Sequence, residues 1–160
     1  MKAYHLKFSQ RIPVSINEAW DFFSSPANLA IITPEAMAFT ITSTPEDEQE
    51  MYPGMIITYK VSPLAGIRLN WMTEITQLEP HKYFIDEQRF GPYKFWQHQH
   101  HFKALPGGVE IKDILTYGLP MGIFGKAANS LFVAGKLQQI FSYRKQKITE
   151  IFGDYAVTGM

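Results

Sequence analysis

The sequence contains no cysteine among its 160 residues, which excludes disulfide bonds, thiolate metal ligands and a cysteine nucleophile. It also has no excess of either charge, because 15 Lys and Arg residues balance 15 Asp and Glu residues. A neutral chain without a basic cluster has no general attraction to nucleic acid or to an anionic membrane surface. No apolar run approaches the roughly 18 residues of a membrane span, and residues 1–8 lack the apolar stretch of a signal peptide. We therefore expect a cytoplasmic protein with no nucleic-acid partner and no membrane span.

Aromatic side chains, in contrast, are abundant: they make up 14% of the chain, with 12 Phe, 8 Tyr and 3 Trp. Rings in this number suit either a large core or a cavity lined by rings. The length suits one folded unit, which we expect to span residues 1–153, followed by a loose tail at 154–160.

The first 32 residues predict a strand followed by two short helices. Apolar and polar residues alternate over 3–12, which is typical of a half-buried strand. Ser15 and Glu18 have the spacing of a capping box and open a first helix. Pro26 then suits the first position of a second short helix, which ends near Ile32.

Strand patterns and then a helical pattern fill the rest of the chain. Short Pro- and Gly-containing connections separate the strands and predict antiparallel hairpins. The expected strands lie near 37–44, 54–62, 67–78, 82–90, 95–105 and 108–117. Apolar residues then recur at helical spacing over 123–152, which predicts a long amphipathic helix. Gly135 is an unfavourable residue inside this helix. We expect the basic stretch from Tyr143 to Lys147, which includes Arg144, to lie on a solvated face of the helix. The sequence therefore predicts an α+β fold, with a seven-stranded curved antiparallel sheet wrapped around a long C-terminal helix.

Several segments resemble the START-like (SRPBCC) superfamily, whose members have the helix-grip fold. The matching segments are PVSINEAWDFF at 13–23, PANL at 26–29, Thr33-Pro34, F-x-D-x-Q at 84–88, GPY at 91–93 and W-x-H-x-H-x-F at 96–102, followed by Asp113, Tyr117 and Pro120. This superfamily includes polyketide cyclase/dehydratase-like and pollen-allergen-like proteins, and the later segments resemble a bacterial branch of small members. The resemblance implies the helix-grip fold and a cavity that binds a hydrophobic ligand such as a lipid. It transfers no catalytic motif and implies no cofactor.

Period-two alternation decides which strand residues point into that cavity. We expect the inward-pointing residues to be Phe84, Asp86, Gln88 and Phe90 in the strand at 82–90, Trp96, His98, His100 and Phe102 in the strand at 95–105, and Asp113, Leu115 and Tyr117 in the strand at 108–117.

Hairpin register then predicts which of these side chains meet. A two-residue Pro106-Gly107 turn pairs His100 with Asp113. Pairing Phe90 with Trp96 puts Asp86 opposite His100, and the remaining expected pairs are Gln88 with His98, Thr73 with Asp86 and Trp71 with Gln88. The central hypothesis is a carboxylate–imidazole–carboxylate row, Asp86–His100–Asp113, that raises the pKa of the imidazole and keeps both carboxylates ionised.

The row has two interpretations besides a structural or ligand-orienting network. In the first, His98, His100, Asp86 and Asp113 are catalytic candidates: a histidine moves a proton next to a carbonyl whose oxygen is held by Tyr59, Tyr117 or Gln88. In the second, His98-x-His100 and one aspartate supply three metal ligands. Because the aspartates are equally well explained as histidine partners, we expect no metal.

The favoured function is the binding of a small hydrophobic or amphipathic molecule between the sheet and the long helix. The expected ligand-binding residues are Tyr59, Trp71, Thr73, Phe84, Asp86, Gln88, Phe90, Trp96, His98, His100, Asp113, Tyr117 and Leu131. A cyclase/dehydratase-type enzyme and a co-chaperone-like interaction module remain alternatives. An absent cavity would favour the interaction module.

Overall fold

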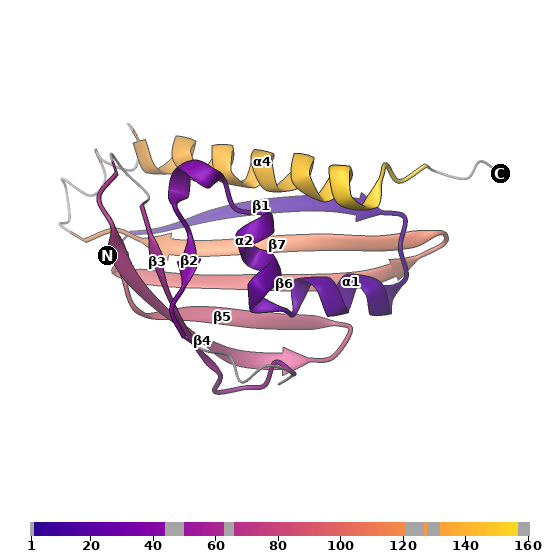
Figure 1. Cartoon of the computed structure of the whole chain (residues 1–160), viewed down its shortest axis with the longest axis horizontal. Coiled ribbons are helices and arrows are strands. Elements are labelled where there is room, and N and C mark those ends of the chain that lie inside the picture. The colour runs from indigo at the N-terminus through magenta and orange to yellow at the C-terminus, as the bar shows by residue number, and fades with distance from the viewer. Residues whose placement is uncertain (1, 44–49, 63–65, 121–126, 128–131, 157–160) are drawn as a thin grey trace.

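The computed structural model describes residues 2–43, 50–62, 66–120, 127 and 132–156. Seven antiparallel strands form one sheet in the order β1-β7-β6-β5-β4-β3-β2 (Figure 1). Their bounds are β1 Ala3–Ile12, β2 Thr40–Ile41, β3 Ile56–Val61, β4 Leu69–Glu79, β5 Tyr83–Phe90, β6 Phe95–Leu105 and β7 Gly108–Gly118. This is the predicted α+β architecture of the helix-grip fold.

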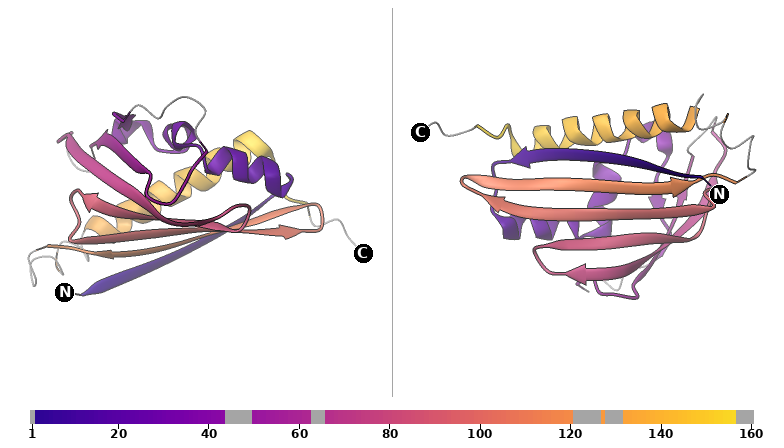
Figure 2. Two further views of the ribbon diagram at one scale, coloured as in Figure 1. Left: turned by 90° about the horizontal axis from the view of Figure 1, so that it is seen from below. Right: turned by 180° about the vertical axis from the view of Figure 1, so that it is seen from behind.

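The helices all lie on one face of this sheet, as the two views of Figure 2 show. They are α1 (Ile16–Phe23), α2 (Pro26–Ile31), the 3-10 turn η1 (Glu35–Met37) and the long α4 (Ala134–Phe152). The predicted capping box at the start of α1 is confirmed: Glu18 N–H donates to Ser15 Oγ at 3.2 Å, and Ser15 N–H donates to Glu18 Oε2 at 2.9 Å. Within the described residues, none of the helices has the length and apolarity that crossing a membrane requires.

One element boundary differs from the predicted one. β2 is far shorter than 37–44, because η1 occupies Glu35–Met37 and Ala38 then adopts a left-handed φ of 45° that breaks the extended chain. α4 is described from Ala134, and the predicted start at 123 lies outside the described residues. Leu131 and most of the predicted first turns of this helix lie outside the described residues.

The register is correct for one hairpin and wrong for the next two. His100 pairs with Asp113 across β6 and β7, as the two-residue turn predicted. On the other side of β6, however, Asp86 lies opposite His98 rather than His100. The predicted partners on β4 are also displaced, since Thr73 pairs with Gln88 and Ile75 pairs with Asp86.

The loop between β5 and β6 explains the displaced register. The Gln88 side chain donates to Tyr93 O at 2.6 Å and accepts from Tyr93 N–H at 3.2 Å. These two bonds lie in the loop beyond the last strand pair, which is Glu87 with Gln97 rather than the predicted Phe90 with Trp96.

A bulge at the end of β5 makes the inward prediction for Phe90 wrong. From Thr73 to Met72 the partner on β5 advances by two positions, from Gln88 to Phe90. The extra residue reverses the alternation of faces. Phe90 therefore lies on the outer face with Met72 and is 63% exposed.

The C-terminal end of the described chain packs against the β6–β7 turn. The Tyr155 hydroxyl donates to Pro106 O at 2.7 Å, and the Tyr155 ring covers the backbone of Gly108. A Cβ atom on Gly108 would lie 2.2 Å from Ile12 O and 2.8 Å from the Tyr155 ring. The position therefore requires glycine. Gly135, by contrast, has nothing within 4 Å of such an atom, so no close contact explains it.

We predict that Gly108→Ala and Gly135→Ala have opposite effects. Gly108→Ala lowers the free energy of unfolding by about 2–4 kcal/mol, because the new methyl group collides with backbone. Gly135→Ala raises it by up to about 1 kcal/mol, because alanine favours the helix and meets no neighbour. Urea denaturation of both variants measures the two effects. A neutral Gly108→Ala variant would contradict the packing described here.

Candidate functional site

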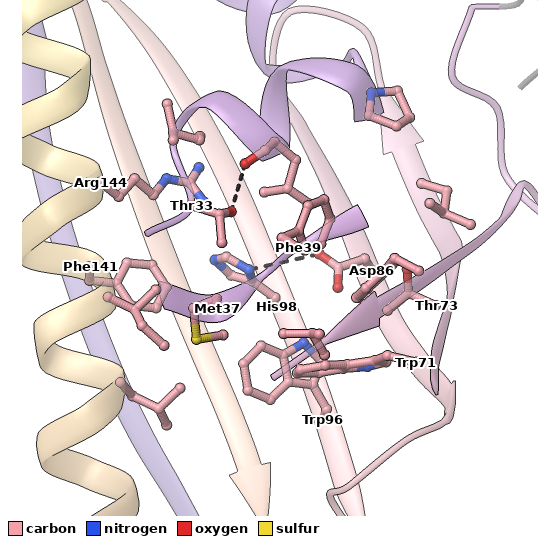
Figure 3. Close-up of a pocket in the computed structure, with 18 of the residues that line it drawn as sticks. Thr33, Met37, Phe39, Trp71, Thr73, Asp86, Trp96, His98, Phe141 and Arg144 are labelled. Atoms are coloured by element: carbon pink, nitrogen blue, oxygen red, sulfur yellow. Dashed lines mark hydrogen bonds and ion pairs between the residues drawn. The ribbon is translucent and has the colours of Figure 1, made fainter. Parts of the chain in front are cut away.

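A cavity of about 640 Å³ separates the inner face of the sheet from α1, α2 and α4. Figure 3 shows residues that line it, drawn from the sheet and from the helices. Of the residues predicted to bind a ligand, those that line it are Tyr59, Trp71, Thr73, Phe84, Asp86, Trp96, His98 and His100. Part of the apolar lining comes from the helices, including Phe23, Leu29 and Phe141.

Aromatic rings build one wall of the cavity. The rings of Trp71 and Trp96 meet edge to face with their centroids 5.0 Å apart. Tyr93 packs against Trp96 at 4.7 Å, and Tyr59 packs against Trp71 at 5.6 Å. Rings that support one another in this way keep fixed positions. The rings therefore line the cavity and do not fill it.

Next to this ring wall, β6 carries two neighbouring imidazoles between two carboxylates. The rings of His98 and His100 lie 3.8 Å apart, as expected for alternate residues of β6. His98 Nε2 donates to Asp113 Oδ1 at 2.9 Å, and His100 Nε2 donates to Asp86 Oδ2 at 3.0 Å. The remaining nitrogens complete the cluster: His100 Nδ1 is 3.2 Å from Asp113 Oδ1 and His98 Nδ1 is 3.8 Å from Asp86 Oδ2.

The predicted Asp86–His100–Asp113 contacts are therefore present, although one predicted strand pair was wrong. Asp86 lies opposite His98 and reaches His100 across the diagonal. This diagonal places His98 inside the cluster as a second imidazole. Figure 3 shows His98 and Asp86 pointing toward one another from neighbouring strands.

Arg144 of α4 is the main polar residue that the sequence reasoning misplaced. We expected it on a solvated helix face, but its side chain is buried and lines the cavity. Its Nη2 lies 3.5 Å from Asp113 Oδ1, and its guanidinium lies over the Phe141 ring at 5.9 Å. The spacing of the buried helix residues contained the necessary information, because Arg144 stands three positions after Phe141 and four before Ile148.

Burial and mutual contacts set the protonation of this cluster. Burial raises the pKa of Asp113, but the Arg144 charge and the contacts with His100 and His98 outweigh it and hold that pKa well below its usual range. Burial likewise raises the pKa of Asp86, yet its hydrogen bond from His100 and the charge of His98 bring the net pKa below the ordinary value. Both aspartates are therefore ionised.

The two histidines shift in opposite directions. Burial and the neighbouring charge of His100 lower the pKa of His98. Burial acts in the same direction on His100, but its contacts with Asp113 and Asp86 outweigh burial and raise its pKa. The raised pKa favours the charged form of His100, which with Arg144 balances the two carboxylates, and the lowered pKa favours neutral His98. Because a neutral His98 retains a lone pair, the cluster can both donate and accept a proton.

Four described residues of the predicted ligand set do not line the cavity. Gln88 holds the Tyr93 backbone, and Asp113 lies behind the two imidazoles. Tyr117 is buried in the core beside Leu115, whereas Phe90 faces outward. Leu131 is outside the described residues.

Comparison with known proteins relates this chain to others at the level of fold. No family model and no curated protein match it. Among solved structures, TTHA0849 from Thermus thermophilus is similar with a TM-score of 0.68 at 14% identity, covering 92% of this chain and 99% of that one. The major latex-like protein 151 from Panax ginseng gives a TM-score of 0.63 at 12% identity, covering 94% and 97%. Ara h 8.0201 gives 0.58 at 15% identity, covering 93% and 99%. These likenesses confirm the helix-grip fold.

We predict that Asp113→Asn changes the acid sensitivity of the protein. A carboxyl group whose pKa is lowered by folding adds stability above its unfolded pKa and loses it as the pH falls toward its folded pKa. The variant should be less stable by about 3 kcal/mol at pH 7, because it leaves buried cations without their partner. This difference should shrink as the pH falls from about 5 toward 2.

Denaturant titrations across this pH range, in buffer with EDTA, measure the difference. The exposed Asp21→Asn serves as the matched control, and it should stay within about 0.5 kcal/mol of the parent protein at every pH. A difference for Asp113→Asn that does not change with pH would contradict the ionised state of Asp113.

Proposed function

We propose that this protein binds a small amphipathic molecule in the cavity between the sheet and α4. The observation that carries this proposal is a cavity of about 640 Å³ with mostly apolar walls and a few buried polar groups. Sites for small ligands have this character, with volumes of roughly 300–1,000 Å³. The apolar body of the ligand would pack against the ring wall of Trp71, Trp96 and Tyr93.

Unpaired donors in the wall indicate the chemistry of the polar end. Among the described residues, Trp71 Nε1, Arg144 Nε and His100 Nδ1 are buried without a hydrogen-bond partner, and the last lies 3.2 Å from Asp113 Oδ1. Leaving a buried donor unpaired costs about 1–3 kcal/mol, so such groups are normally satisfied by a ligand or by water. Trp71 Nε1 and Arg144 Nε can only donate. The ligand should therefore carry acceptor oxygen atoms, as a carbonyl or carboxylate does.

The resemblance to START-like proteins agrees with this proposal, because it implies a cavity for hydrophobic ligands. The similar solved structures support the shared fold and do not identify a ligand. An interaction module would be favoured if the protein had no cavity. The cavity of about 640 Å³ therefore speaks against that alternative.

A cyclase/dehydratase-type enzyme is the second candidate, and one observation favours it. His98 and His100 line the cavity with pKa values pushed in opposite directions. Titratable neighbours separated in this way are typical of an acid and a base that act together. If His100 is catalytic, His100→Ala lowers turnover of a reactive ligand by orders of magnitude. If the cluster only orients the ligand, the same change alters affinity alone.

We predict that native mass spectrometry of the freshly purified protein detects a bound small molecule. The added mass should disappear on denaturation, because the contacts depend on the folded cavity. The mass of the released compound, and its behaviour in negative-ion mode, then identifies its chemical class. Protein that is consistently free of added mass and that also fails to bind the probes described next would contradict the proposal.

We predict that decanoate binds more tightly than decylamine, because the wall offers donors and a guanidinium. Isothermal titration calorimetry of decanoate, decanol and decylamine should show a preference of at least about tenfold for decanoate over the amine, since one hydrogen bond to a charged group is worth about 1.5–3 kcal/mol. A preference for the amine would contradict the assignment of the polar end.

Trp71→Phe tests the indole donor while keeping an aromatic ring in the wall. We expect it to weaken decanoate binding about fivefold, as the loss of one hydrogen bond of about 1 kcal/mol implies. Trp20→Phe is the matched control, because Trp20 of α1 packs against Phe84 and does not line the cavity. Equal affinities for the two variants would exclude Trp71 from ligand recognition.

A further inference from the structure

Three ligand atoms of the polar cluster converge on one point beside the cavity. Asp86, His98 and His100 each offer one ligand atom within 4.8 Å of the other two. Asp86 Oδ2 lies 3.8 Å from His98 Nδ1 and 3.0 Å from His100 Nε2. The sequence led us to expect no metal, but from this geometry we propose that the three residues bind a divalent transition-metal ion such as Zn²⁺. Two imidazole nitrogens and one carboxylate oxygen form a donor set that suits zinc, cobalt, nickel and ferrous iron.

The spacing of the three atoms fits an ion of this size. Donor atoms at about 2.0–2.1 Å from a tetrahedral ion lie about 3.3 Å from one another. Asp86 Oδ2 is 3.0 Å from His100 Nε2 and 3.8 Å from His98 Nδ1, so the observed distances lie on either side of that value. Binding of the ion would displace the proton that His100 Nε2 donates to Asp86, and small side-chain adjustments would then bring both nitrogens and the oxygen to bonding distance.

Asp113 supplies the supporting contacts that metal-binding histidines usually have. Its Oδ1 accepts from His98 Nε2 at 2.9 Å and lies 3.2 Å from His100 Nδ1. One carboxylate thus faces the far nitrogen of both rings and turns the near nitrogen of each toward Asp86. Such a carboxylate fixes the tautomer and orientation of metal-binding imidazoles. Arg144, 3.5 Å behind, offsets the charge of Asp113.

The same geometry leaves part of the coordination sphere open to the cavity. Asp86, His98 and His100 all line the cavity, whereas Asp113 does not. The ion would therefore have three protein ligands and a remaining position for water or for an oxygen atom of a guest. Sites with three protein ligands and an open position are typical of metals that take part in binding or chemistry rather than in structure alone.

Calorimetric titration of the EDTA-treated, dialysed protein with Zn²⁺ tests this proposal. We expect one ion per chain with a dissociation constant in the micromolar range or below, and Co²⁺ in place of Zn²⁺ should give a visible absorption spectrum. Asp86→Asn and His98→Ala should each weaken binding at least about 100-fold. Asp113→Asn should weaken it about 10–100-fold, because it removes the support without removing a ligand.

His101→Ala is the matched control, because His101 follows His100 on β6 but points to the other face, where its Nε2 contacts Gln99. Its zinc affinity should equal that of the parent protein. Circular dichroism confirms that each variant is folded, and zinc should raise the melting temperature of the parent but not of Asp86→Asn. No stoichiometric binding, or unchanged binding by both Asp86→Asn and His98→Ala, would overturn the proposal. Decanoate binding in the presence of EDTA tests the proposed ligand function separately.

Discussion

The structure depends on one buried carboxylate, Asp113, which contacts side chains of both the sheet and α4. His98 and His100 approach it from the neighbouring strand, and Arg144 approaches it from α4. An isolated buried charge is strongly unfavourable, so each of these groups requires the others in place. The cluster therefore ties α4 to the sheet beside the cavity.

The cavity is maintained by contacts among the side chains that form its wall. In most proteins a space of this size would be removed by closer packing of the surrounding side chains. Here the Trp71, Trp96 and Tyr93 rings pack against one another along the sheet, while the polar cluster keeps the helix from moving inward. α1 and α2 contribute Phe23 and Leu29 to the remaining side. Binding to such a preformed space requires little reorganisation, which favours affinity.

Local rules predicted the parts of the fold that local chemistry decides. The β6–β7 register followed from a turn of known length, and α1 began where Ser15 and Glu18 predicted. The β5–β6 register did not follow, because it depends on the Gln88 side chain binding the Tyr93 backbone in a longer loop. The alternation of apolar and polar residues in one strand cannot reveal a bulge, and a bulge places Phe90 on the outer face. Arg144 was misplaced because its charge was given more weight than its position on the buried stripe of α4.

The pairing of β1 with β7 has a consequence for the way the chain must assemble. His5 and Thr116 are hydrogen-bonded neighbours although 111 positions separate them in the sequence. During synthesis the first strand therefore has both edges unpaired until β7 has been made. Closing so large a loop is entropically expensive and makes folding slow compared with a chain of local contacts. Lys7 and Arg11 on that waiting strand supply charge of the kind that discourages association with other unpaired strands.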